Sequence, residues 1–257
     1  MGQIRGYDRN QVLIGTLLGD ATLVVSSHKK RKAALRVKHK DANEDYIMWL
    51  LKYLEPYATN GYSIRIETDK KTGNKYRVLH INSTRKLYYM WKRFYVVNPA
   101  AKSIYTSGIK KIKPQILNSI GELALAVWYM DDGWLDVNIN EHDNVNRIRI
   151  GLATCAFTEH ENRLLIGMLK KKFGIEANMY KKYNKYPYLI LNTEAALKLL
   201  SIVYKYVYEI ESMRYKLEVP VYNPHKHVLT EAMESFRKAR CPLEGNDIVQ
   251  TFPKGER

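Results

Sequence analysis

The chain has 257 residues, which is enough for one large domain or two of ordinary size. Its formal net charge of +16 favours a polyanionic partner, although a basic protein of ribosomal type has the same balance. A hydrophobic fraction of 46% and twenty tyrosines exclude a disordered basic tail and predict a folded core.

Cysteine usage and hydropathy limit the class of protein further. The two cysteines, Cys155 and Cys241, are too few and too distant for a disulfide framework or a cysteine zinc site. The apolar run at 123–130 is too short to cross a bilayer, and MGQIRG contains no signal-peptide core. We therefore expect a soluble protein of a reducing compartment, such as a bacterial or archaeal cytoplasm or an organelle matrix.

In the first half, periodicity and turn signals predict the order helix, strand, strand, helix, strand, strand, helix. The predicted ranges are about 13–21, 22–28, 34–40, 43–55, 62–68, 75–82 and 85–96. Asp8 with Gln11 has capping-box spacing before the first helix, and Ser83 or Thr84 is expected to cap the last one.

The second half repeats this order, so the chain is predicted to be an internal duplication. The ranges there are about 125–133, 134–139, 146–154, 158–172, 176–182, 186–191 and 193–207. Capping boxes are expected at Ser119 with Glu122 and at Thr158 with Glu161. Pro99, Gly108 and Pro114 make a long helix unfavourable between the halves, and residues 228–239 have the spacing of a short amphipathic helix.

Two apolar runs occupy equivalent places in the repeat, LIGTLLGDA at 13–21 and LAVWYMDDG at 125–133. A helix without a polar face must be buried all round. Each run ends in an aspartate, Asp20 or Asp132, near the negative end of the helix dipole, where a cation is favoured. Two such helices side by side would bring the carboxylates together, which is costly unless a proton or a divalent metal lies between them.

Both runs resemble the motif of the LAGLIDADG homing endonucleases, and the likeness extends over most of residues 10–219. The matching positions are Leu13, Gly15, Leu17, Asp20 and Ala21 in the first run, and Leu125, Ala126, Asp132 and Gly133 in the second. Val127 and Asp131 depart from the pattern, where small residues are usual. In carrying two copies of the motif, the chain resembles the monomeric branch of the family.

The resemblance implies an α+β fold of two pseudo-symmetric αββαββα halves. Each half would carry a four-stranded antiparallel saddle sheet, and the halves would pack through the two motif helices. The expected division is 1–97 for the N-terminal half, 98–118 for a linker, 119–219 for the C-terminal half and 220–257 for an extension.

Alternation along the predicted strands exposes one polar row on each sheet. The stretch HKKRKAALRVKHK at 28–40 contains seven Lys or Arg residues and no acid, which favours contact with phosphates or base edges. The residues predicted to face DNA are Arg36, Lys38, Lys40, Arg65, Glu67, His80, Asn82, Arg147, Arg149, Asn178, Tyr180, Lys182, Tyr186 and Tyr188. By the same alternation, Arg77 is expected on the opposite face of its strand and is a weaker candidate for DNA contact. For any single residue, a solvated sheet face is the simpler interpretation.

Asp20 and Asp132 are the predicted metal ligands, because carboxylate oxygens suit Mg²⁺, with Mn²⁺ as a substitute. The resemblance adds the backbone carbonyls of Gly19 and Asp131 as ligands. It also implies that two lysines, Lys111 and Lys216, reach the cleavage centre. Lys110 and Lys113 are alternatives to Lys111 for the first of these two positions. Surface lysines without a role are the alternative in a chain this rich in lysine.

These observations favour a monomeric, metal-dependent endonuclease that cuts one phosphodiester on each strand of a long, non-palindromic duplex DNA. One alternative on the same fold is a maturase that binds intron RNA. Another is a DNA-binding regulator without catalytic activity. Retained Asp20 and Asp132 favour the nuclease over both.

Overall fold

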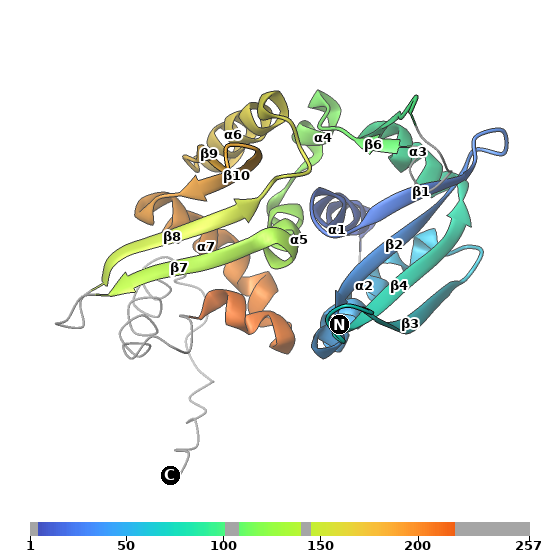
Figure 1. Ribbon diagram of the computed structural model, residues 1–257, viewed down its shortest axis with the longest axis horizontal. Helices are drawn as coiled ribbons and strands as arrows, with labels where there is room; N and C mark the ends of the chain where they lie inside the picture. Colours follow the sequence, from blue (N-terminus) through green and yellow to red (C-terminus); the bar gives the residue numbers. More distant parts are fainter. Residues whose placement is uncertain (1–4, 101–107, 140–144, 219–257) are drawn as a thin grey trace, which may run out of the picture.

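The computed structural model of the protein describes residues 5–100, 108–139 and 145–218. The helix expected at 228–239 lies outside these residues. Within the described ranges, no helix combines the length and the apolar composition needed to cross a membrane. The fold is α+β and consists of two similar halves, as predicted (Figure 1).

Each half contains a four-stranded antiparallel sheet with helices on one face (Figure 1). The first half contains α1 (Gly6–Leu18), β1 (Thr22–Ser27), β2 (Lys32–Lys40), η1 (Asp41–Asn43), α2 (Glu44–Leu54), η2 (Glu55–Tyr57), β3 (Tyr62–Thr68), β4 (Lys75–Thr84) and α3 (Arg85–Phe94). The second half contains α5 (Glu122–Asp132), β7 (Gly133–Ile139), β8 (Val145–Ala153), α6 (Glu159–Phe173), β9 (Asn178–Lys182), β10 (Tyr186–Leu191), α7 (Thr193–Tyr208) and η4 (Glu211–Leu217). The strand orders β1-β2-β4-β3 and β7-β8-β10-β9 are equivalent, which confirms the repeat.

Helices α1 and α5 pack against each other at the centre of the molecule, between the two sheets (Figure 1). Both helices are buried along most of their length, as expected for helices without a polar face. They approach closely at Gly15, where a Cβ would lie 2.6 Å from the carbonyl oxygen of Ala124 and 2.6 Å from Cβ of Val127, and again at Gly19, where a Cβ would lie 2.4 Å from Cβ of Asp131. Two glycines of the first helix, Gly15 and Gly19, therefore leave the space that Val127 and Asp131 occupy in the second.

The capping boxes predicted before the two motif helices are wrong. Helix α1 begins earlier, at Gly6, so Asp8 lies inside its first turn. Ser119 ends a preceding short helix, and Gly121 is the N-cap of α5. Gln11 instead bridges the two halves, because its Nε2 donates to the carbonyl oxygen of Ser119 and its Oε1 accepts from the backbone N–H of Gly121. A side chain of one motif helix thus satisfies an N-terminal donor at the start of the other.

The caps predicted at Thr84 and at Thr158 with Glu161 are confirmed, since the side chain of Thr84 accepts a backbone N–H and Thr158 forms a reciprocal box with Glu161; Asn192 caps α7 in the same way as Thr84. Between the halves, β5 (Tyr95–Val97) pairs with β6 (Gly108–Lys110), and α4 (Pro114–Ser119) follows. Glu161 also accepts the backbone N–H of Ile112, at 2.8 Å. One buried carboxylate therefore caps α6 and attaches the connection between the halves to the second half.

Replacing Gly15 by alanine tests the helix contact. Alanine adds about 1 kcal/mol of helix propensity, but its methyl group would meet the backbone of α5. Overpacking of this kind costs about 1–3 kcal/mol or more where backbone must move. We expect Gly15→Ala to lower the free energy of unfolding in urea.

Gly167→Ala is the matched control, because Gly167 lies inside α6 and an added Cβ there meets no atom within 4 Å among the described residues. This variant should gain up to about 1 kcal/mol. An equal stabilisation of both variants would contradict close packing at Gly15.

Candidate metal centre and nucleic-acid interface

The two predicted metal ligands lie at the C-terminal ends of the central helices. Asp20 follows α1 directly after Gly19, and Asp132 is the last residue of α5. Burial, followed by the charge of Asp131, raises the pKa of Asp20 to about 6. Burial, followed by the charges of Asp20 and Asp131, raises the pKa of Asp132 to about 7. Neighbouring carboxylates therefore destabilise the charged form of both aspartates, Asp131 acting on Asp20, and Asp20 with Asp131 acting on Asp132, and a divalent cation between them would relieve this.

Two lysines lie beside these aspartates, Lys110 from the connection between the halves and Lys216 from η4 of the second half. Lys110 Nζ donates to the carbonyl oxygens of Gly19 and Ala21, at 3.2 and 3.1 Å. Lys216 Nζ donates to the carbonyl oxygen of Gly133, at 2.5 Å. Burial lowers the pKa of both lysines, while the neighbouring aspartates act in the opposite direction. Each ammonium is thus held at the backbone next to one of the two helix-terminal aspartates.

The prediction that Lys111 reaches this centre does not fit the structure. Lys111 points to α6, where its Nζ lies 3.7 Å from Oε2 of Glu161. Lys113 is also directed elsewhere, since its Nζ donates to the carbonyl oxygens of Lys92 and Tyr95. Lys110 takes the position because β6 pairs with β5 and successive side chains of a strand point to opposite sides.

Asp131 has a different environment from its neighbour Asp132. Its side chain is fully buried, and its Oδ2 accepts from Thr16 Oγ1 at 3.0 Å and from the backbone N–H of Asp20 at 3.2 Å. Its Oδ1 accepts from Tyr46 Oη at 2.6 Å. The side chain of Asp131, which departs from the motif, therefore connects α5 to α1 and α2. The predicted role of the Gly19 and Asp131 carbonyls as metal ligands stays a prediction.

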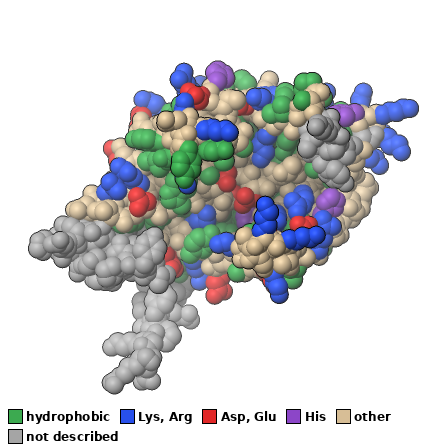
Figure 2. Space-filling model, in the orientation of Figure 1, with side chains coloured by type: hydrophobic (Ala, Val, Ile, Leu, Met, Phe, Trp, Pro, Cys, Tyr) green, Lys and Arg blue, Asp and Glu red, His purple; other side chains and the backbone are tan. Residues whose placement is uncertain are grey.

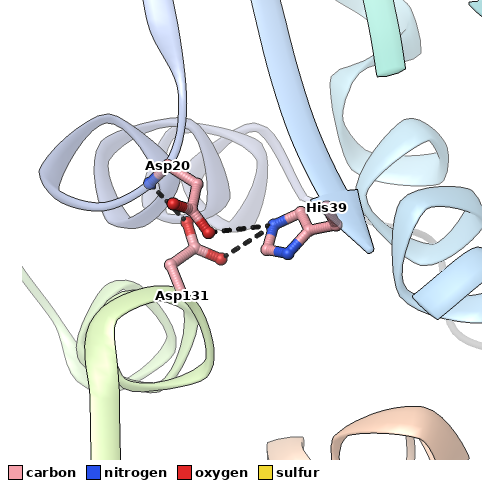
Figure 3. Close-up of side chains that lie close together, drawn as sticks. All are labelled: Asp20, His39 and Asp131. Carbon is pink, nitrogen blue, oxygen red and sulfur yellow. Dashed lines mark hydrogen bonds and ion pairs between the residues drawn. The ribbon is translucent and has the colours of Figure 1, made fainter. Parts of the chain in front are cut away.

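His39 is a site residue that sequence reasoning missed. It lies on β2 with the side chain toward the ends of the central helices, and its Nε2 is 3.4 Å from Asp131 Oδ1 and 3.6 Å from Asp20 Oδ2 (Figure 3). Burial disfavours the imidazolium, but the carboxylates of Asp131 and Asp20 outweigh burial and raise the pKa of His39. Alternation along the strand predicts an inward side chain here but not a polar interior.

The residues predicted to face DNA are all at least partly exposed on the two sheets. In the first sheet, antiparallel register places Arg36 opposite His80 on the outward face. Glu67 joins two arginines of this face, lying 2.5 Å from Arg36 and 3.0 Å from Arg65. Arg77 lies on the other face and pairs with Asp41 and Glu44, as its parity indicates.

The second sheet has a different outward face. Arg147 lies 3.8 Å from Asp136, and Arg149 is opposite Asp136 in the register. Next to them the rings of Tyr180 and Tyr188 stack with centroids 6.0 Å apart, and Trp134 lies against Tyr188. The first sheet thus offers mainly cations and the second a mixture of cations and aromatic rings.

A cavity of about 420 Å³ lies between the first sheet and the ends of the central helices. It is lined by Asp20, Arg36, Lys38, His39, Lys40, Asn43, Tyr76, Met130, Asp131 and Tyr215. In Figure 2, Lys and Arg side chains gather over the first half, and acidic and histidine side chains lie in the hollow between the halves. Carboxylates thus lie at the bottom of a basic surface, which suits a metal ion that meets a polyanion.

Comparison with known proteins agrees with the geometry. The model of the LAGLIDADG DNA endonuclease family matches residues 10–199. Probable intron-encoded endonuclease 1 of Wickerhamomyces canadensis is 28% identical over 212 residues, covering 81% of this chain and 83% of the relative. Cytochrome b mRNA maturase bI2 of Debaryomyces hansenii is 26% identical over 219 residues, covering 80% of this chain and 72% of the relative.

Other matches concern parts of longer proteins or the fold alone. Protein RecA of Mycolicibacterium fallax is 25% identical over 210 residues, and the match covers 80% of this chain. The chain spans about half the length of the RecA relatives that it matches, at 45% and 50%. The homing endonuclease I-WcaI, solved with its DNA recognition sequence, has the same fold, with a TM-score of 0.61, 23% identity and coverage of 86% of this chain and 90% of that one. With a family model that spans both central helices and both sheets, this chain belongs to the LAGLIDADG DNA endonuclease family.

Proposed function

We propose that this protein is a site-specific endonuclease that hydrolyses one phosphodiester in each strand of a long, asymmetric duplex DNA. The observation that carries the proposal is the pair Asp20 and Asp132 at adjacent helix ends, with their pKa values raised to about 6 and 7. The two exposed sheets beside this pair provide a surface for duplex DNA on either side of it. Two non-identical halves in one chain would bind such a site as a monomer.

A divalent ion, Mg²⁺ or Mn²⁺, fits the donor set of this centre, since Asp20 and Asp132 offer carboxylate oxygens. When bound, such an ion supplies an activated water and stabilises the leaving oxygen. Lys110 and Lys216, which lie at the same helix ends, would offset the negative charge that develops on the scissile phosphates. Glu161 helps to position Lys110 indirectly, because it accepts the backbone N–H of Ile112 and so anchors the segment that carries this lysine.

A second candidate function is supported by the similarity to cytochrome b mRNA maturase bI2. On this alternative the basic surface binds intron RNA, and the aspartates are not required. Filter binding with intron RNA and with duplex DNA separates the two functions. A preference for RNA together with no cleavage of DNA would favour the maturase.

Substituting the helix-terminal aspartates tests the metal centre. Asp20→Asn and Asp132→Asn should each abolish most double-strand cleavage and keep DNA binding, because asparagine preserves the shape but not the charge. Both should also raise the melting temperature of the metal-free protein at neutral pH. A carboxylate with a raised pKa in the folded state loses stability as the pH rises through that pKa, and asparagine removes this loss.

Cleavage, gel shift and melting are measured on the same preparations. Glu176→Gln is a control that removes a carboxylate charge, because Glu176 is exposed, pairs with Lys170 and belongs neither to the centre nor to the residues predicted to face DNA. Full cleavage by either helix-terminal variant would contradict the assignment. A loss of cleavage with Glu176→Gln equal to that of Asp132→Asn would also contradict it.

Salt should weaken DNA binding steeply. For duplex DNA the logarithm of the binding constant falls with the logarithm of salt concentration by about 0.9 per neutralised phosphate. A net charge of +16 indicates several such contacts. Titrations at increasing salt measure the slope, and an affinity that stays constant would contradict contact through the basic sheets.

The differences between the two sheets predict a non-palindromic target bound by one chain. If Arg149 makes a bidentate base contact, Arg149→Ala should relax the preference in one half-site, at a cost of about 1–3 kcal/mol. Lys40→Ala should weaken binding evenly across sequences if Lys40 meets phosphate. A substitution scan of the target measures both effects, and sedimentation gives the stoichiometry. A palindromic target occupied by two chains would contradict the monomer.

A further inference from the structure

His39 is a buried side chain whose environment the proposed cleavage chemistry does not use. Only 5% of the side chain is exposed, and its Nε2 makes no hydrogen bond within the described residues. This atom is directed at the carboxylates of Asp20 and Asp131 (Figure 3). A buried imidazole nitrogen aimed at two carboxylates forms an ion pair when the ring is charged and, when it is neutral, offers the donor arrangement of a metal-ion site.

The spacing of the three donors fits a single ion. Nε2 of His39 lies 3.4 Å from Asp131 Oδ1 and 3.6 Å from Asp20 Oδ2, and the donor atoms of this trio all lie within 4.8 Å of one another. Ligands at about 2.1 Å from a tetrahedral ion are about 3.4 Å apart. Small side-chain rotations therefore suffice to place all three donors around one ion.

The surroundings hold these donors in place. Asp131 is fixed by hydrogen bonds from Tyr46 Oη and Thr16 Oγ1, which are the outer contacts that orient a ligating carboxylate. The ring of Tyr46 packs edge-on against the His39 ring, with centroids 4.8 Å apart. His39, Asp20 and Asp131 all line the 420 Å³ cavity, which gives an ion a path of entry and leaves room for water ligands.

We propose that His39, Asp20 and Asp131 form a binding site for a first-row transition-metal dication such as Zn²⁺ or Mn²⁺. The site differs from the proposed magnesium centre, because it uses the side chains of His39 and Asp131 in place of Asp132. Imidazole with carboxylates suits zinc, cobalt or manganese, whereas Mg²⁺ prefers oxygen ligands. The two sites share Asp20, so they compete for one carboxylate.

This competition has a consequence for activity. An ion at the His39 site withdraws Asp20 from magnesium, so Zn²⁺ should inhibit cleavage at a fixed Mg²⁺ concentration. Only this consequence rests on the proposed endonuclease function. The site itself is tested by metal binding without DNA, so the failure of one idea is distinguishable from the failure of the other.

The experiment uses the full chain, freed of metal with a chelator and titrated with Zn²⁺ by calorimetry in millimolar Mg²⁺. The wild-type protein should bind one Zn²⁺ more per chain than His39→Gln, or bind it at least tenfold more tightly. The absorption of Co²⁺ in the visible range provides a second reading, since a nitrogen and oxygen site of low coordination number gives a strong band. This band should also be lost with His39→Gln.

Three further variants make the result decisive. Asp20→Asn should weaken Zn²⁺ binding at least tenfold, and it tests the site independently if His39→Gln does not fold, since Asp20 is exposed. Asp132→Asn should keep Zn²⁺ binding, which separates this site from the magnesium centre. His160→Gln, at an exposed histidine of α6, should bind Zn²⁺ like the wild type. Unchanged Zn²⁺ binding by folded His39→Gln or by Asp20→Asn would overturn the proposal, as would equal losses with His160→Gln.

Discussion

The contact between α1 and α5 is the constraint on which the rest of the structure depends. Close approach at Gly15 brings two helix C-termini, with Asp20 and Asp132, into one partly buried place. Such a place is unfavourable for anions, because three effects act against them: burial, repulsion between charges of the same sign, and the negative ends of the helix dipoles. Raising the pKa of Asp132 from 3.8 to about 7 means that the fold disfavours its ionised form by a free energy on the order of a few kcal/mol. Complete burial of single leucines such as Leu13 and Leu17 contributes about 1.5–3 kcal/mol each. Packing of the central helices can therefore hold the carboxylates together without a bound ion.

Asp131 makes the helix contact specific as well as close. A buried carboxylate is costly unless its oxygens are paired, and this one receives hydrogen bonds from Thr16, Tyr46 and the backbone of Asp20. These donors come from the first half, whereas Asp131 belongs to the second. Gln11 makes a reciprocal bridge at the opposite end of the helices. The two polar bridges fix the helices lengthwise, which apolar packing alone would not.

Most of the fold followed from the sequence because the local signals agreed with the global repeat. Alternation of polar and apolar residues gave the strands and their outward faces, including the opposite parity of Arg77. The motif-helix caps could not be predicted, since a tertiary contact from Gln11 replaces a local one. The choice between Lys110 and Lys111 depends on the pairing of β5 with β6, two strands too short to show a pattern. The polar environment of His39 depends on Asp131, whose position is known only once the helices are packed.

The two sheets show how one chain can present unlike halves on a shared fold. In the first sheet Glu67 holds Arg36 and Arg65 side by side, so two guanidinium groups are oriented by one carboxylate. In the second sheet Trp134 lies over Gly151, where an added Cβ would be 1.9 Å from the indole ring, so glycine is required beneath it. Oriented guanidinium groups suit the acceptors of guanine, and flat apolar rings suit the methyl group of thymine. Since the strand order is the same in both halves, the difference in chemistry comes from side chains alone, and these can diverge without disturbing the helix contact that holds the two halves together.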